Sequence, residues 1–467
     1  MLPRLLLSLL LMGIPIQAIA SPSDPVSTVV LSMTAAVDNA MENNPGIAAA
    51  RFGTESAVSR ENQARAGFYP LVDFREAYNR TNNPMWAFGT RLNQETISRQ
   101  DFDPARLNDP AAIDNFSSTL SMTWPIYDSG RTWHGWQQAR FGSRISELTA
   151  LRVRQQVTAQ VIQAYLGLQL SLESKKVVDQ TLDVARAHLA SARNRYQNGQ
   201  AVKSDLLRAR VRIATIEQEL IEAESRIEVA RSALNAAMGQ EEETAFDPAT
   251  PLMRPERIGG SANEWVASAM DRRPDLQAFD RQIAVADEEI TKSRAAHWPA
   301  VNLVGNYEID TEDFGGYGDN YSIGAVVQVN LFSGKRLSEK EREARSARKE
   351  ADARQKAMTL EIRHQTRAAF FEARSSDARI EVAEANIDQA AEVLRIVQDR
   401  YKNGLLPIID LLDAEVALEQ AKTNRVKATH DSLAARTRLC LAAGAMDRNF
   451  PAILGGALHP PQRPPTP

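Results

Sequence analysis

The stretch RYKNGLLPIIDLLDA, residues 400–414, lies between two long runs of helix-forming residues. Its Asn-Gly pair is typical of a helix end, and Pro407 follows Gly404 by three residues. A closely similar stretch, RYQNGQAVKSDLLRA, occupies residues 195–209, 205 positions earlier, with eight of fifteen positions identical. A turn that occurs twice between long helices predicts two helical hairpins with similar tips.

The repeat extends well beyond the two turns. Pro45 and Pro274 stand at equivalent positions 229 residues apart, whereas Gly239 and Gly444 are 205 residues apart, so the first copy contains an insertion. The insertion falls between Pro70 and Gly130. We therefore predict a tandem duplication with residues 21–240 and 263–445 as two structural repeats, a Pro- and Gly-containing linker at 241–262 and a Pro-rich C-terminal tail at 446–467.

The N-terminus and the composition limit the class of protein. Residues 1–20 contain Arg4, an apolar run and a small-residue cleavage site at 18–20, which predicts a secretory signal peptide. No later stretch reaches the roughly 18 apolar residues of a transmembrane helix. A net charge of −4 without a basic stripe gives no reason to expect nucleic acid as a partner. If the exported chain enters a membrane, it must do so with strands.

Four segments have the alternating pattern of β-strands, at about residues 69–80, 116–128, 300–310 and 320–332. In the second of them, apolar residues such as Leu120 and Met122 alternate with Ser117, Thr119 and Ser121. A small soluble sheet with one buried face would give the same alternation. Strand length and the long polar connections between paired strands favour a membrane β-barrel. Four strands are too few to close a barrel, for which about eight is the usual minimum, so other copies of the chain would have to complete it.

The helical segments after the strands are unusually long. Residues 131–198 contain no proline and would span on the order of 100 Å as a helix. Apolar or small residues recur with coiled-coil spacing at Val178, Leu182, Ala185, Leu189, Ala192 and Tyr196, and again 205 residues later. We predict long antiparallel hairpins at about 131–239 and 336–444.

Together, the duplicated strand-strand-long-helix order and the two R-Y-x-N-G-x-x-x-x-x-D-L-L-x-A tips resemble the TolC-like outer-membrane efflux and export ducts. The resemblance covers the mature chain. It implies a mainly α fold with a β-barrel part, in which three chains form one twelve-strand barrel in the outer membrane on a periplasmic α-helical barrel. It also implies a periplasmic adaptor protein, an inner-membrane transporter and outer-membrane lipid as partners.

The resemblance further implies a gate at the periplasmic tips. By position, a lumenal carboxylate ring falls on Asp410 and Asp413, and links between the hairpins fall on Ser204, Asp205 and Tyr401. The turn and adaptor-docking positions are Arg195, Tyr196, Asn198, Gly199, Arg400, Asn403, Gly404 and Leu405. Family members place an arginine on the second hairpin where this chain has Leu406, so that link to Asp205 is absent.

The aspartates also have a simpler interpretation. Asp205 and Asp410 follow equivalent turns, where an Asp commonly caps a helix or complements its dipole. Asp413 differs, because the first copy has Arg208 at that position. Asp410 and Asp413 are three residues apart on one helix face, so a trimer would gather six carboxylates around one axis.

No other sequence pattern predicts a catalytic or metal-binding site. The six histidines have no metal-ligand spacing, and lone histidines on helices, such as His188 and His364, are expected to be solvated. We predict no enzyme activity, catalytic residue, cofactor or metal. The predicted function is a passive exit duct for efflux or type I secretion, with a structural periplasmic coiled-coil protein as the alternative; an adaptor protein fits less well, because it would need only one hairpin.

Overall fold

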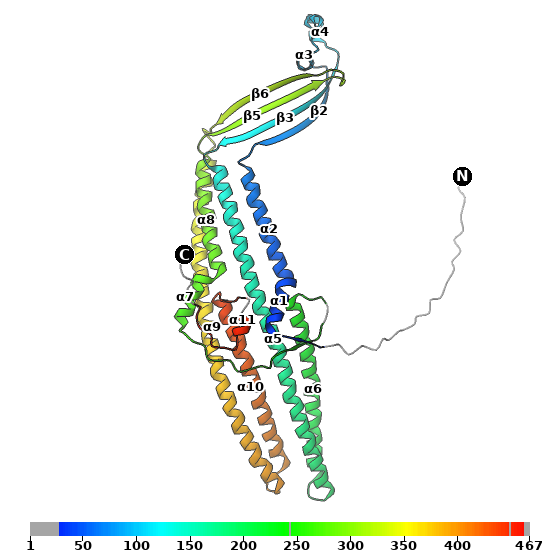
Figure 1. Ribbon diagram of the computed structural model, residues 1–467, viewed down its shortest axis with the longest axis vertical. Helices are drawn as coiled ribbons and strands as arrows, with labels where there is room; N and C mark the ends of the chain where they lie inside the picture. Colours follow the sequence, from blue (N-terminus) through cyan, green and yellow to red (C-terminus); the bar gives the residue numbers. More distant parts are fainter. Residues whose placement is uncertain (1–27, 242–243, 448–449, 462–467) are drawn as a thin grey trace, which may run out of the picture.

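The computed structural model describes residues 28–241, 244–447 and 450–461. The predicted signal peptide at 1–20 lies outside these residues. The molecule is elongated, with a four-stranded sheet at one end and the tips of two helical hairpins at the other (Figure 1). In the part of the chain that the structure describes, no helix combines the length and apolar character needed to cross a membrane.

The two halves of the chain follow the same order of elements, apart from three short helices between the long strands of the first half and one short helix at the end of the second. The first half contains β1 (Val29–Leu31), α1 (Met33–Asn43), α2 (Pro45–Ala66), β2 (Leu71–Thr81), α3 (Pro84–Asn93), η1 (Arg99–Phe102), α4 (Pro104–Asn108), β3 (Ile113–Tyr127), α5 (Arg131–Gln197) and α6 (Lys203–Met238). The second half contains β4 (Phe246–Pro248), α7 (Ala262–Arg272), α8 (Pro274–Ala295), β5 (Ala300–Thr311), β6 (Gly318–Gln328), α9 (Arg336–Lys402), α10 (Ile408–Ala442) and α11 (Phe450–Ile453). Proline occupies the first helical position of both α2 and α8, where its missing N–H costs no hydrogen bond.

The sheet is antiparallel, with strand order β2-β3-β5-β6. Its two outer strands, β2 and β6, each have one unpaired edge in the single chain. The alternation predicted a strand to residue 332, but β6 ends at Gln328. Gln328 pairs with Ala300, the first residue of β5, so the chain beyond Gln328 has no strand to pair with.

The long helices have the predicted seam. Helices α5 and α9 each contain 67 residues and pack against α6 and α10 as antiparallel hairpins. Val178, Leu182 and Ala185 are buried with Ile216 of α6. Tyr196 departs from the seam, because it lies at the hairpin end and is 40% exposed.

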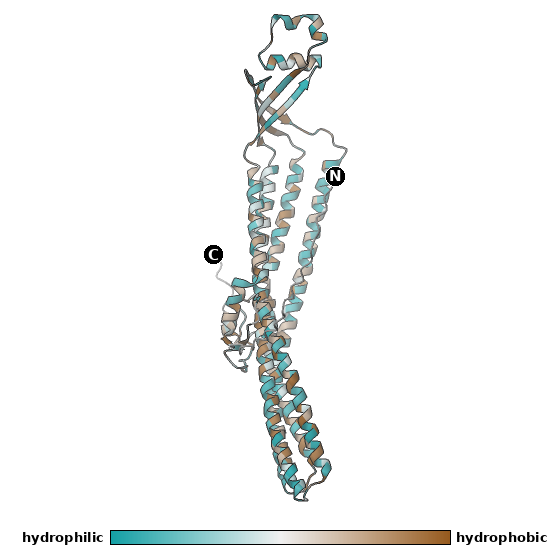
Figure 2. Cartoon of the chain, turned by 90° about the vertical axis from the view of Figure 1, so that its right-hand side faces the viewer, coloured by the Kyte–Doolittle hydropathy of each residue, from teal (hydrophilic) through white to brown (hydrophobic). Residues whose placement is uncertain are grey.

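The main hydrophobic core lies midway along the molecule, where α1, the middle of α5 and the end of α10 meet (Figures 1 and 2). Two short segments that the sequence did not predict to be ordered add to it. Strands β1 and β4 pair in parallel across the chain, and Met446, Phe450, Leu454 and Leu458 of the Pro-rich C-terminal segment are buried.

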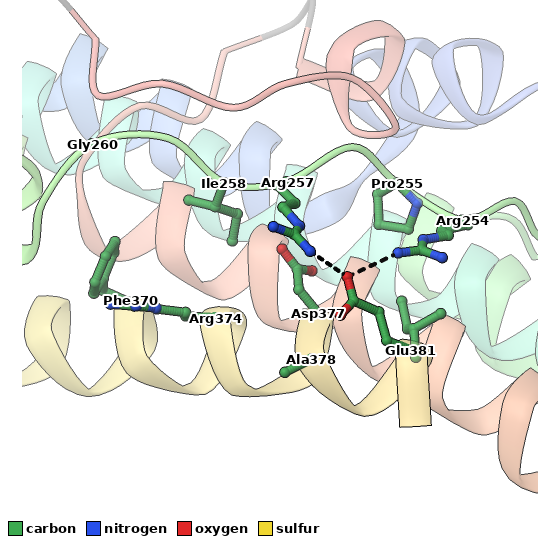
Figure 3. A pocket seen from close by; sticks show the side chains of 11 residues that line it. Arg254, Pro255, Arg257, Ile258, Gly260, Phe370, Arg374, Asp377, Ala378 and Glu381 are labelled. Carbon is green, nitrogen blue, oxygen red and sulfur yellow. Dashed lines mark hydrogen bonds and ion pairs between the residues drawn. The ribbon is translucent and has the colours of Figure 1, made fainter. Parts of the chain in front are cut away.

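A cavity of about 510 Å³ lies between the segment 254–260 and α9 (Figure 3). Arg254 and Arg257 both donate to Glu381 of α9 across this cavity. These exposed pairs hold the segment after β4 against the second hairpin.

Candidate functional site

The two hairpin turns have the same backbone conformation. Gly199 and Gly404 have φ values of 72° and 73°, in the left-handed region that favours glycine. The N–H of Gln200 donates to the carbonyl of Arg195 at 2.8 Å, and the N–H of Leu405 donates to that of Arg400 at 2.9 Å. These are the bonds of a Schellman motif, which satisfies the last carbonyls of each helix.

The two hairpins share a small hydrophobic core near their tips. It is formed by buried residues from all four long helices, namely Ala192, Ala209, Leu394, Tyr401, Ile408, Leu411, Leu412 and Ala414. Because each hairpin covers apolar surface of the other, separating the tips exposes that surface to water. The tips of one chain are therefore held together in this structure.

Arg195 forms the first polar link between the hairpins. Its guanidinium donates to the backbone carbonyls of Tyr401 and Lys402, both at 3.1 Å, and lies 4.8 Å from the centre of the Tyr401 ring. A cation at the C-terminal end of α9 complements the helix dipole and satisfies terminal carbonyls. The equivalent arginine of the second copy, Arg400, is exposed.

A second link joins α5 to α10. His188 Nε2 lies 2.5 Å from Oε1 of Glu415, a residue that is only 7% exposed. The expectation that His188 is solvated was wrong, because α10 packs over this part of α5. The expectation for His364 was correct, since that side chain is exposed.

Arg212 of α6 forms a third link, to Glu419 of α10. Both side chains are largely buried, and Arg212 also lies 3.7 Å from Glu219. Burial raises the pKa of the Glu419 carboxyl above its ordinary value, although the charge of Arg212 opposes that shift. Glu415 and Glu419 are four residues apart and so lie on one face of α10, directed at the first hairpin.

The predicted linking residues are only partly brought together. Tyr401 takes part through its ring and its carbonyl. Ser204 and Asp205 lie in the first turn of α6, and within the described residues neither side chain makes a hydrogen bond or ion pair. Neither Asp205 nor Asp410 caps its helix. Each carboxylate lies in the first turn, where it stabilises the helix only by complementing the positive end of the helix dipole.

Asp410 and Asp413 lie on the side of α10 turned away from the first hairpin. Asp413 is exposed, Asp410 is half-buried, and Leu411, Leu412 and Glu415 between and beyond them are buried. At about 100° per residue, Asp413 stands roughly opposite Glu415 around the helix. Both aspartates therefore lie on a side of the second hairpin that the first hairpin does not cover.

The structure explains how the tip is held without the missing arginine. Leu406 is half-buried at the second turn, while the arginine that bridges the hairpins comes from the first one, as Arg195. Sequence reasoning overlooked His188, Arg212, Glu415 and Glu419. One signal was available, because Glu415 and Glu419 correspond to Arg210 and Ala214 in the first copy and so are not explained by shared hairpin geometry.

Comparison with known proteins supplies the family. The model of the family described as outer membrane efflux protein matches residues 36–240 and 265–445. The chain belongs to the outer membrane efflux protein family. The predicted resemblance, the exit-duct function and the outer-membrane location are therefore confirmed at the level of this family.

Two relatives in this family cover most of the chain. The alkaline protease secretion protein AprF of Pseudomonas aeruginosa is 26% identical over 426 residues, 87% of this chain and 83% of its own. The proteases secretion protein PrtF of Dickeya chrysanthemi is 22% identical over 422 residues, 87% of each chain.

Two solved structures have the same fold as this chain. The outer membrane protein VceC of Vibrio cholerae matches with a TM-score of 0.72 at 20% identity, covering 88% of this chain and 96% of its own. CusC matches with a TM-score of 0.76 at 16% identity, covering 92% of this chain and 96% of its own. The predicted combination of a helical barrel and a β-barrel part is the fold of these channels.

Proposed function

We propose that three copies of this chain form one outer-membrane duct. The observation that carries the proposal is the four-stranded sheet with unpaired edges at β2 and β6. An open edge cannot face lipid, and four strands cannot close a barrel, so β2 of one copy would pair with β6 of the next in a twelve-strand barrel. The two ranges matched by the family model support treating residues 21–240 and 263–445 as the repeats of each copy.

The register of the sheet supports a water-filled lumen. Directly paired residues share a face, and Thr119, Glu308 and Asn320 form one such row, as do Ser121, Asn306 and Ser322. The opposite face carries rows such as Phe74, Leu120 and Tyr307. The polar face lines the lumen and the apolar face contacts lipid.

The gate of this duct lies at the hairpin tips. The three links from Arg195, His188 and Arg212 hold the second hairpin against the first, and parting the hairpins opens the tunnel without further chemistry. Asp410 and Asp413 of three copies form the lumenal ring, where six carboxylates favour cations. The turns with Arg400, Asn403 and Leu405 dock the periplasmic adaptor.

An inner-membrane transporter supplies the energy, and we propose protein as the cargo. The names of AprF and PrtF refer to protease secretion, and both relatives cover 87% of the chain. Efflux of small molecules is the second candidate, because the pyoverdine export outer membrane protein OpmQ of Pseudomonas aeruginosa is 23% identical over 72% of this chain.

Deleting the gene in its source organism separates these candidates. Type I secretion predicts loss of one or a few proteins from the culture supernatant with unchanged susceptibility to small toxic compounds. An unchanged supernatant together with increased susceptibility would favour efflux. Recovery of the protein from the periplasm without detergent would contradict the duct and favour a structural coiled-coil protein.

A further inference from the structure

The inserted segment between β2 and β3 is folded and lies across the sheet. Although it connects β2 to β3, its helix α3 contacts β3, β5 and β6. Phe88 of α3 packs edge-on against Phe102 of η1 with ring centres 5.8 Å apart, and Arg91 lies 3.9 Å from Asp101. Figure 1 shows α3 and α4 beyond the ends of the strands that are farthest from the helices.

The strand register shows on which face this segment lies. Ser117, Asp310 and Gly318 form one row across β3, β5 and β6, and so share the face that also presents Thr119 and Glu308. A Cβ atom at Gly318 would lie 2.1 Å from the carbonyl oxygen of Asn93. The end of α3 is therefore pressed against the polar face of the sheet.

Hydrogen bonds fix the same contact. Gln94, which is 4% exposed, donates to the carbonyl of Asp114 at 2.9 Å and to Asn115 Oδ1 at 2.8 Å. Asn115 in turn donates to Asp310 Oδ1 at 2.6 Å, and Asp310 is 1% exposed. Such buried, mutually bonded polar groups fix one docked position of the segment.

We propose that residues 82–112, here called the strap, narrow the external mouth of the duct and limit the size of what leaves it. The inference rests on the proposed function, because the polar face must be the lumenal one. The strap buries Ala87 and leaves Met85 and Trp86 exposed at 81% and 67%. Three straps around the axis of a trimer present these large apolar side chains at the exit. Bulky cargo therefore passes only when the side chains or the whole straps move aside.

Access to a cysteine below the strap tests the proposal. Asn306 is exposed on the polar face, four residues before Asp310 in β5, and Cys440 is buried and gives little background. In intact cells, Asn306→Cys is reacted from outside with a small charged thiol reagent and with a maleimide carrying a long polyethylene glycol chain. If the strap narrows the mouth, the small reagent should modify Asn306→Cys quickly and the bulky reagent should modify it slowly.

Gly318→Val in the same background displaces Asn93 and is expected to raise the bulky reagent's rate about tenfold, because undocking shifts the strap's equilibrium. Gly324→Val is the matched control, since a Cβ at Gly324 meets Val304 Cγ2 only at an ordinary 3.8 Å. Gln94→Ala removes the hydrogen bonds without added bulk and is expected to act in the same direction as Gly318→Val.

Equal rates of the bulky reagent in Gly318→Val, Gln94→Ala and Gly324→Val would overturn the strap while leaving the duct intact. Failure of the small reagent to reach Asn306→Cys in every variant would show that the polar face is not a lumen. That result would overturn both the proposed duct and the strap.

Discussion

The two arginines at position 195 and at its repeat equivalent, 400, have different surroundings. Arg195 donates two hydrogen bonds to the end of α9, whereas Arg400 is exposed. Arg195→Ala is expected to weaken the closed tip by about 1.5 to 3 kcal/mol, the usual contribution of hydrogen bonds made by charged groups. Cells should then become more sensitive to a large hydrophilic antibiotic that the outer membrane normally excludes. Arg193→Ala, which removes an exposed arginine of α5 two residues earlier, is the control, and equal sensitivity of the two variants would contradict a latch at Arg195.

Asp413 should set the charge preference of the closed tip. It is exposed on the side of α10 opposite Glu415, and in a trimer three copies would lie around the axis. Asp413→Ala, alone and combined with Asp410→Ala, is expected to lower cation selectivity, measured as a reversal potential in planar bilayers with unequal salt. Asp205→Ala on the first hairpin should leave the potential unchanged. Unaltered selectivity in the double variant would count against the carboxylate ring.

At the scale of elements, a charged clamp joins the start of α8 to α5 and to the end of α10. Arg273 donates to Asp275 through Nε at 2.9 Å and Nη2 at 2.5 Å, and Arg152, which donates to the carbonyl of Leu441, lies 3.8 Å from Asp275. Burial opposes ionisation of Asp275, but the bonds from Arg273 and the charges of both arginines outweigh it and hold the pKa of Asp275 below its ordinary value.

A lowered pKa means that this carboxylate stabilises the fold above its unfolded pKa of about 3.9 and loses that effect as the pH falls through the folded value. Asp275→Asn should therefore lower stability at pH 7 by about 1 to 3 kcal/mol, and by less near pH 2. Thermal unfolding followed by circular dichroism in detergent measures both. An equal loss at the two pH values would show that charge plays no part in the clamp.

Elements with strong local patterns were predictable, and those that depend on distant contacts were not. The 67-residue helices and their glycine turns follow from coiled-coil spacing and from the φ that glycine allows. Strands β1 and β4 have three residues each and form only because they pair with each other across the chain. No local sequence pattern predicts such a pairing. The C-terminal segment looked like a tail because of its prolines, yet Phe450 is 1% exposed.

Partners across the hairpins were equally beyond local prediction. Helix periodicity places His188 on α5 and Glu415 on α10, but only their packing brings the two within 2.5 Å. Resemblance to the family directed attention to Ser204 and Asp205, which make no side-chain contact of this kind in the described chain. Comparing the two repeats was informative where their residues differ, as at Asp413 and Glu415, because the shared hairpin geometry does not explain those residues.

At the scale of the whole molecule, the duct that we propose requires more than one chain. Its sheet ends in unpaired edges at β2 and β6, and its polar face needs other copies to become a lumen. In the proposed trimer, the strap lies at one end of the lumen, and the links at Arg195, His188 and Arg212 lie at the other. The proposed duct is therefore restricted at both ends and open along its length.

A cryo-electron microscopy reconstruction of the detergent-extracted protein would show whether three chains form one duct. We expect three copies around one axis, with β2 of each copy hydrogen-bonded to β6 of the next and a continuous lumen from the strap to the hairpin tips. A particle containing one chain, or three chains whose β2 and β6 edges remain unpaired, would contradict it.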